Sequence, residues 1–73
     1  MKEAHFVICI NNNDYPASLE RRKIYDTIPD SDAAKHGQIR VIDESGEHHL
    51  YPRECFVDAD LSDETRAAVV EAA

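Results

Sequence analysis

The stretch VIDESGEHHLYPRECF, residues 41–56, decides the fold of this chain. An apolar, strand-like run leads into a short polar turn, and a second strand-like run follows the turn. Gly46 supplies the positive φ that a tight turn requires. Pro52 ends the second run as a strand, because proline cannot donate to a ladder hydrogen bond. The stretch predicts a β-hairpin over residues 38–51, a tight turn at 53–56 and a short fifth strand after it.

Two further strands are predicted before the hairpin. HFVICI, residues 5–10, is β-branched and aromatic and is bounded by turn-forming residues. Both of its sides are apolar, so both should be covered. Residues 22–28 alternate between two sets of side chains and end at Pro29, which indicates a strand. The alternative for this segment is a helix over residues 18–28, capped by Ser18.

Two helices complete the predicted elements. PDSDAAKHG, residues 29–37, reads as about one helical turn, capped by Asp30 or Ser31 and ended by Gly37. Residues 60–73 form a second helix, capped by Asp60 or Ser62 and expected to lie near the first strand. Its predicted inner face consists of Leu61, Thr65, Ala68, Val69 and Ala72.

Together these elements predict a single mainly β domain over residues 1–73, with five short strands in a small barrel and a short C-terminal helix. The alternative is an α+β fold, an open antiparallel sheet with a helix at residues 18–28. A chain of 73 residues has a thin core and little room for a deep enclosed site. That size argues against a stand-alone enzyme.

HLYPRECFV, residues 49–57, resembles the segment of Src-homology-3 (SH3) domains in which a short turn joins the fourth and fifth strands. In those domains a proline precedes an aromatic-valine pair, and here Phe56 stands one residue further from Pro52 than that pattern expects. The aromatic groove signature of the signalling domains is absent near the N-terminus, and there is no Trp. The resemblance therefore implies an SH3-like architecture and not proline-rich ligand binding.

A second resemblance runs from about Ala17 to Phe56. Its landmarks are a Leu-Glu and Lys-x-Tyr element, Pro-Asp, an Ala-rich turn ending in Gly, the Ile-Asp-Glu-Ser-Gly-Glu hairpin and Tyr-Pro. This succession is similar to that of a family of short bacterial proteins of uncharacterised function. The resemblance implies a small SH3-like barrel and no activity. His48 and His49 stand where the family pattern expects Asp-Tyr, which indicates a local variation rather than a shared metal site.

Composition narrows the classes of partner. The net charge is -7, with acidic residues spread along the chain, and this disfavours nucleic acid, whose binding rests on clustered Lys and Arg. The N-terminal stretch does not fit a signal peptide, and no apolar run reaches the length of a membrane span. Cys9 and Cys55 form no C-x-x-C pair. We therefore expect a cytoplasmic protein with two reduced, buried cysteines.

The sequence gives little support for a metal site or for catalytic residues. Adjacent residues of a strand point to opposite faces, so His48 and His49 should not share one ion. A site built from His49, Cys55 and a third ligand among His5, His36 and Cys9 has no spacing to support it. The carboxylates of the hairpin turn are expected to be exposed at its tip. We predict no metal, no cofactor and no catalytic residues.

The predicted function is a non-catalytic module that binds an unidentified protein or peptide. Arg22, Tyr25 and Tyr51 are predicted to lie together as an exposed contact patch beside Pro52, because aromatic rings beside an arginine favour interface hot spots. The alternative is a small metal-dependent or thiol-dependent accessory enzyme that uses His49 and Cys55.

Overall fold

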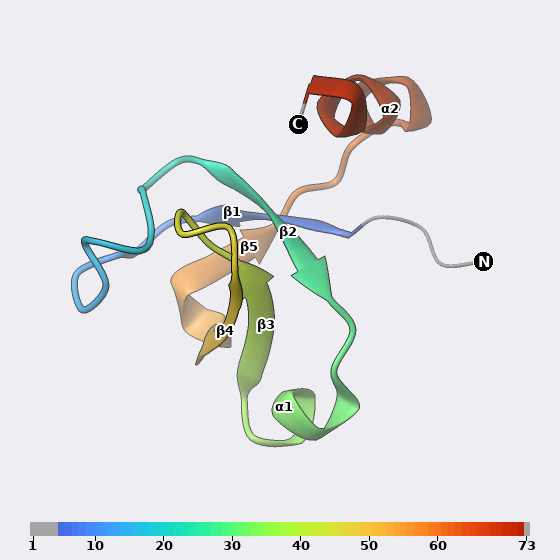
Figure 1. The fold of residues 1–73 in the computed structure, drawn as a ribbon. Helices are drawn as coiled ribbons and strands as arrows, with labels where there is room; N and C mark the ends of the chain where they lie inside the picture. Colours follow the sequence, from blue (N-terminus) through green and yellow to red (C-terminus); the bar gives the residue numbers. More distant parts are fainter. Residues whose placement is uncertain (1–4, 73) are drawn as a thin grey trace.

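The computed structural model describes residues 5–72 (Figure 1). Its strands are β1 (Phe6–Cys9), β2 (Ile24–Ile28), β3 (Gln38–Ile42), β4 (His48–Pro52) and β5 (Phe56–Asp58). Its helices are α1 (Ser31–Lys35) and α2 (Asp63–Ala72), and a 3₁₀ turn, η1 (Arg53–Cys55), joins β4 to β5. The predicted succession of five strands, a one-turn helix and a C-terminal helix is confirmed.

The five strands form an antiparallel sheet in the order β4-β3-β2-β1-β5. Consecutive strands are neighbours from β1 to β4, and β5 returns to pair with β1. The alternative helix over residues 18–28 is wrong: Ile24–Ile28 is paired with β1 on one side and β3 on the other. The tight turn between β3 and β4 is confirmed, with Gly46 at a φ of 82°.

The core lies on one side of the sheet. Paired residues of antiparallel strands share a face, and Val7 pairs with Tyr25 while Ile39 pairs with Tyr51. The fully or nearly buried side chains on this side are Val7, Cys9, Leu19, Tyr25, Val41, Tyr51, Cys55 and Phe56. Leu19 comes from the long loop over residues 10–23, which folds back over the sheet. The prediction that Cys9 and Cys55 are both buried is confirmed.

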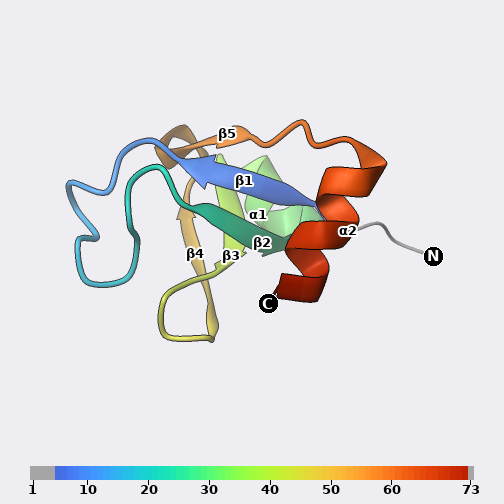
Figure 2. The same ribbon diagram turned by 90° about the horizontal axis from the view of Figure 1, so that it is seen from above.

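The opposite side of the sheet is covered only in part. Helix α2 lies over the end of the sheet where β1 begins (Figures 1 and 2), and there Phe6 is buried. Ile10, further along, is 49% exposed, so the expectation that both sides of this segment are covered holds at Phe6 and is wrong at Ile10. No residue of α2 is buried, so the helix covers this end of the sheet without entering a core of its own.

The N-terminal caps of both helices are as predicted, but the inner face of α2 differs from the prediction. Asp30 Oδ1 accepts the Ala33 N–H at 3.0 Å, and Ser62 Oγ accepts the Thr65 N–H at 3.1 Å. In α2 the partly buried side chains include Arg66 and Val69. The predicted members Thr65, Ala68 and Ala72 are exposed, so that part of the prediction is wrong. Among residues 5–72, no helix is long and apolar enough to cross a membrane.

Candidate functional site

The predicted contact patch is contradicted by burial. Tyr25 is 4% exposed and Tyr51 3% exposed, so neither ring is available at the surface. The pairing that turns Val7 and Ile39 inward turns their partners Tyr25 and Tyr51 inward as well. The expectation that Arg22, Tyr25 and Tyr51 form a surface patch is therefore wrong.

Arg22 itself is exposed, in the turn before β2, with a φ of 76°. Its N–H donates to the Cys9 carbonyl at 2.7 Å, and this bond closes the long loop. Few non-glycine residues adopt a positive φ, and the closure of the loop accounts for this one. Pro52, the remaining member of the predicted set, is half-buried where β4 ends.

The hydroxyl of Tyr25 connects the long loop to the hairpin turn through two hydrogen bonds. It accepts the Glu20 N–H at 2.7 Å and donates to Glu44 Oε2 at 2.6 Å. The Lys23 ammonium reaches the same carboxylate oxygen at 2.6 Å. Burial and the bond to Glu44 raise the pKa of Tyr25, and the bonds from Lys23 and Tyr25 lower the pKa of Glu44. This contact is structural, because it joins the long loop to the hairpin turn through a buried hydroxyl that both donates and accepts a hydrogen bond.

Asp43 is the centre of a second polar network. Its Oδ2 accepts the Tyr51 hydroxyl at 2.6 Å and lies 2.7 Å from His49 Nδ1, and its Oδ1 accepts the Ser45 N–H at 2.9 Å. The Asp43 side chain is 1% exposed, so the expectation of a solvent-exposed turn tip is wrong for this residue. Burial raises its pKa, but hydrogen bonds from Ser45, Tyr51 and His49 outweigh burial and hold that pKa well below its usual range.

The histidines and cysteines are not brought together. His49 binds Asp43, whereas His48 Nδ1 lies 3.1 Å from Arg40 Nη1, which confirms that the adjacent histidines diverge. Burial raises the pKa of the Cys55 thiol, which makes it a poor nucleophile near neutral pH. Within the described part of the chain, no group of three or more His, Cys, Asp or Glu residues is arranged to hold a metal ion.

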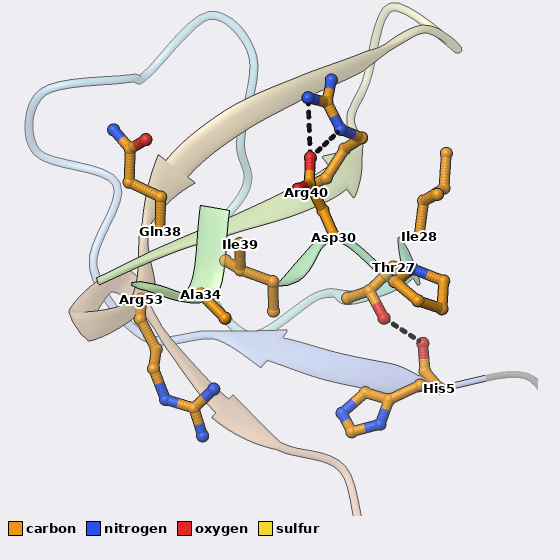
Figure 3. Close-up of a pocket in the computed structure, with 10 residues that line it drawn as sticks. His5, Thr27, Ile28, Asp30, Ala34, Gln38, Ile39, Arg40 and Arg53 are labelled. Atoms are coloured by element: carbon orange, nitrogen blue, oxygen red, sulfur yellow. Dashed lines mark hydrogen bonds and ion pairs between the residues drawn. The ribbon is translucent and has the colours of Figure 1, made fainter. Parts of the chain in front are cut away.

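An open pocket lies where β2, α1, β3 and η1 meet (Figure 3). We call it the α1 pocket. Its volume is about 210 Å³, and it is lined by His5, Thr27, Ile28, Pro29, Asp30, Ala34, Gln38, Ile39, Arg40 and Arg53. None of these residues was predicted to bind a ligand.

The apolar part of the α1 pocket comes from the edge of the core. Ile39 packs against the core cluster and is still partly exposed toward the pocket. Ile28 and Pro29 contribute the end of β2, and α1 contributes Ala34. Within the short α1 helix, Ala33 is buried and Ala34 is exposed. The methyl group of Ala34 leaves space that a longer side chain would fill, so the local sequence keeps the pocket open.

The charged groups of the α1 pocket differ in their partners. Both Nε and Nη2 of Arg40 lie 2.8 Å from Asp30 Oδ2, and the Ala33 N–H and Arg40 lower the pKa of Asp30. The Arg53 side chain is exposed, and within residues 5–72 its guanidinium makes no hydrogen bond or ion pair. Its backbone N–H donates to the Gly37 carbonyl at 2.9 Å. Among residues 5–72, Arg53 is therefore the arginine of the pocket whose backbone is held in place and whose guanidinium has no partner.

Sequence reasoning missed this site for a specific reason. Arg53 follows Pro52 in the segment that fixed the fold, but only the folded sheet places η1 beside α1, about 20 residues earlier in the chain. Comparison of the chain with protein-family models, with curated proteins and with solved structures finds no match. The function is therefore argued from the geometry of the site.

Proposed function

We propose that this chain is a non-catalytic module, built on an SH3-like barrel, that binds a protein or peptide segment in the α1 pocket. One observation carries the proposal. The α1 pocket combines apolar lining, including Ala34 and Ile39, with the guanidinium of Arg53, which has no hydrogen bond or ion pair within residues 5–72. Apolar surface next to a few directed polar groups is the usual composition of a binding site.

The topology supports the barrel. The 3₁₀ turn Arg53–Cys55 follows β4 directly, and β5 then returns to pair with β1 rather than with its neighbour in sequence. A short turn between the last two strands is the feature on which the resemblance to SH3 domains rests. We also propose membership of the family of short bacterial proteins with the same hairpin. Its support is the shared succession from Ala17 to Phe56.

The size of the α1 pocket favours a peptide side chain over a cofactor. Pockets for drug-sized molecules and cofactors have volumes of about 300–1,000 Å³, whereas this one has about 210 Å³. That space accommodates one or two side chains of an extended segment. The non-catalytic role is supported by the buried Cys55 thiol and by the engagement of Asp43 with His49 and Tyr51. Two free thiols in the core support a cytoplasmic location.

The proposal is tested by filling the α1 pocket. Peptides selected from a random displayed library on the wild-type protein are titrated into wild type, Ala34→Gln and Ala67→Gln. Ala34 and Ala67 are both exposed helix residues, on α1 and α2 respectively, so the two variants make the same change inside and outside the pocket. We expect Ala34→Gln to weaken binding about tenfold or more, because the longer side chain occupies the site, and Ala67→Gln to leave it unchanged.

Three outcomes contradict the proposal. The first is equal binding of the selected peptides by wild type and Ala34→Gln, provided that thermal unfolding shows both to be folded. The second is a set of amide chemical-shift changes that map to residues away from α1, β3 and η1. Selection that yields no binding peptide also counts against a peptide-binding module.

A further inference from the structure

We propose that the ligand of the α1 pocket is an acidic segment, in which an Asp or Glu carboxylate pairs with Arg53 and a neighbouring apolar side chain rests on Ile39 and Ala34. This inference rests on the proposed function and adds the chemistry of the partner. Two observations support the inference: Arg40 is already paired with Asp30, and the backbone holds Arg53 at the edge of the pocket.

The pairing of Arg40 removes it as a ligand-binding group. Asp30 occupies two of its guanidinium nitrogens at 2.8 Å, and His48 lies 3.1 Å from a third. His5 is itself 3.3 Å from Asp58. Arg53 is thus the guanidinium of the pocket that has no carboxylate partner in the described part of the chain.

The backbone holds Arg53 at the edge of the α1 pocket. Its N–H is hydrogen-bonded to Gly37, at the end of α1, and Pro52 precedes it with φ fixed at -59°. Figure 3 shows Arg53 and His5 on opposite sides of the pocket with Ile39 between them. A carboxylate bound at Arg53 therefore has apolar surface beside it. Guanidinium and carboxylate groups pair through two parallel hydrogen bonds, which fixes the orientation of the ligand as well as its charge.

Gln38 also lines the α1 pocket, but from the other face of β3. It precedes Ile39 in the strand, and its amide points away from Arg53 and Ile39 (Figure 3). The groups that face a ligand together are therefore Arg53, Ala34 and Ile39, which suit a carboxylate and a neighbouring apolar side chain.

The overall charge of the protein makes the proposal easy to distinguish from non-specific binding. A chain of net charge -7 repels acidic peptides and attracts basic ones at long range. If the protein prefers an acidic peptide, a local ion pair must therefore outweigh the repulsion by the negative net charge. Added salt weakens both the repulsion and the pairing, so charge reversal at Arg53 is the sharper test.

The experiment uses two synthetic peptides, acetyl-Gly-Leu-Glu-Leu-Gly-amide and its Lys analogue, titrated into isotope-labelled protein. Amide shifts of the residues around Ala34 and Ile39 give the affinities. We expect the wild type to bind the Glu peptide with a dissociation constant of about 1 mM or tighter, and the Lys peptide about fivefold more weakly or worse. Arg53→Glu should reverse this preference. Arg21→Glu makes the same charge change at an exposed loop residue outside the pocket and should preserve it.

The outcomes separate this inference from the proposed function. If Ala34→Gln abolishes binding while Arg53→Glu keeps the preference for the Glu peptide, the acidic partner is wrong and the peptide-binding pocket stands. If Ala34→Gln binds both peptides as the wild type does, the pocket itself is wrong, and the inference fails with it. Absence of shifts around the α1 pocket with the Glu peptide also overturns the inference.

Discussion

The hairpin turn, residues 43–47, and the α1 pocket both place charged side chains beside the edge of the core. In the turn, the Asp43 carboxylate is buried and hydrogen-bonded to Ser45, Tyr51 and His49. In the pocket, Arg53 is exposed, unpaired within residues 5–72 and adjacent to apolar surface. A dense cluster of polar side chains is therefore not by itself a binding site. When its polar groups are hydrogen-bonded to one another, the cluster stabilises the fold. When a charged group has no partner within the fold, that group is available to bind another molecule.

The largest expected effect comes from removing the centre of the turn network. Asp43→Ala leaves the Tyr51 hydroxyl buried without its acceptor. We expect a loss of about 3 kcal/mol in the free energy of unfolding, measured by urea denaturation. Asp26→Ala is the control, because Asp26 is exposed on β2, and it should change stability by less than about 0.5 kcal/mol. Equal effects of the two substitutions would show that the network contributes nothing.

Acid should weaken the same network. The folded-state pKa of Asp43 lies below the ordinary value of 3.8, so as the pH falls the unfolded chain takes up the proton first. The stabilisation is present above about pH 4 and is lost as the pH falls below it toward the folded-state pKa. The stability difference between wild type and Asp43→Asn should therefore shrink over this range in urea denaturation. If the stability difference between wild type and Asp43→Asn does not change with pH, the loss of stability in acid comes from another group. Asp30 and Glu44 are the candidates, because their pKa values are also lowered.

A smaller effect is expected where the turn is fastened to the long loop. Tyr25→Phe removes the hydroxyl that joins the Glu20 N–H to Glu44 and should cost about 1 kcal/mol in the free energy of unfolding. Tyr15→Phe is the matched control, because the Tyr15 hydroxyl has no hydrogen bond within the described residues while its ring contacts Tyr51 at 4.9 Å. A Tyr15→Phe variant as unstable as Tyr25→Phe would refute the role of the Tyr25 hydroxyl.

The smallest effect compares the two arginines of the α1 pocket. Arg40→Ala breaks the pair with Asp30 and should lower the melting temperature by a few degrees. Arg53→Ala breaks no hydrogen bond or ion pair within residues 5–72 and should leave the melting temperature unchanged. Calorimetry of the two variants measures the difference. If Arg53→Ala destabilises the protein as much as Arg40→Ala does, Arg53 is part of the fold rather than available to a partner.

The candidate site was much harder to predict than the fold. The β-branched and aromatic residues of Phe6–Cys9 and the alternation in Ile24–Ile28, together with Gly46 and Pro52, indicate strands and a turn, since these signals act over a few residues. The tyrosines were expected at the surface because aromatic rings beside an arginine are typical of interface hot spots. In the structure the hydroxyls find partners at Asp43 and Glu44 inside the fold. Which partner a buried hydroxyl meets depends on residues distant in sequence, so local patterns do not predict it.

Local patterns in the sequence predicted the succession of five strands and two helices, a cap at Asp30 or Ser31, the turn at Gly46 and the divergence of His48 and His49. These follow from backbone preferences and from the two-residue period of a strand. The burial of Asp43, the return of Leu19 to the core and the position of Arg53 beside Ala34 and Ile39 depend on tertiary contacts. Each of these depends on the strand register and on the return of β5 to β1, which bring together side chains that no local signal connects.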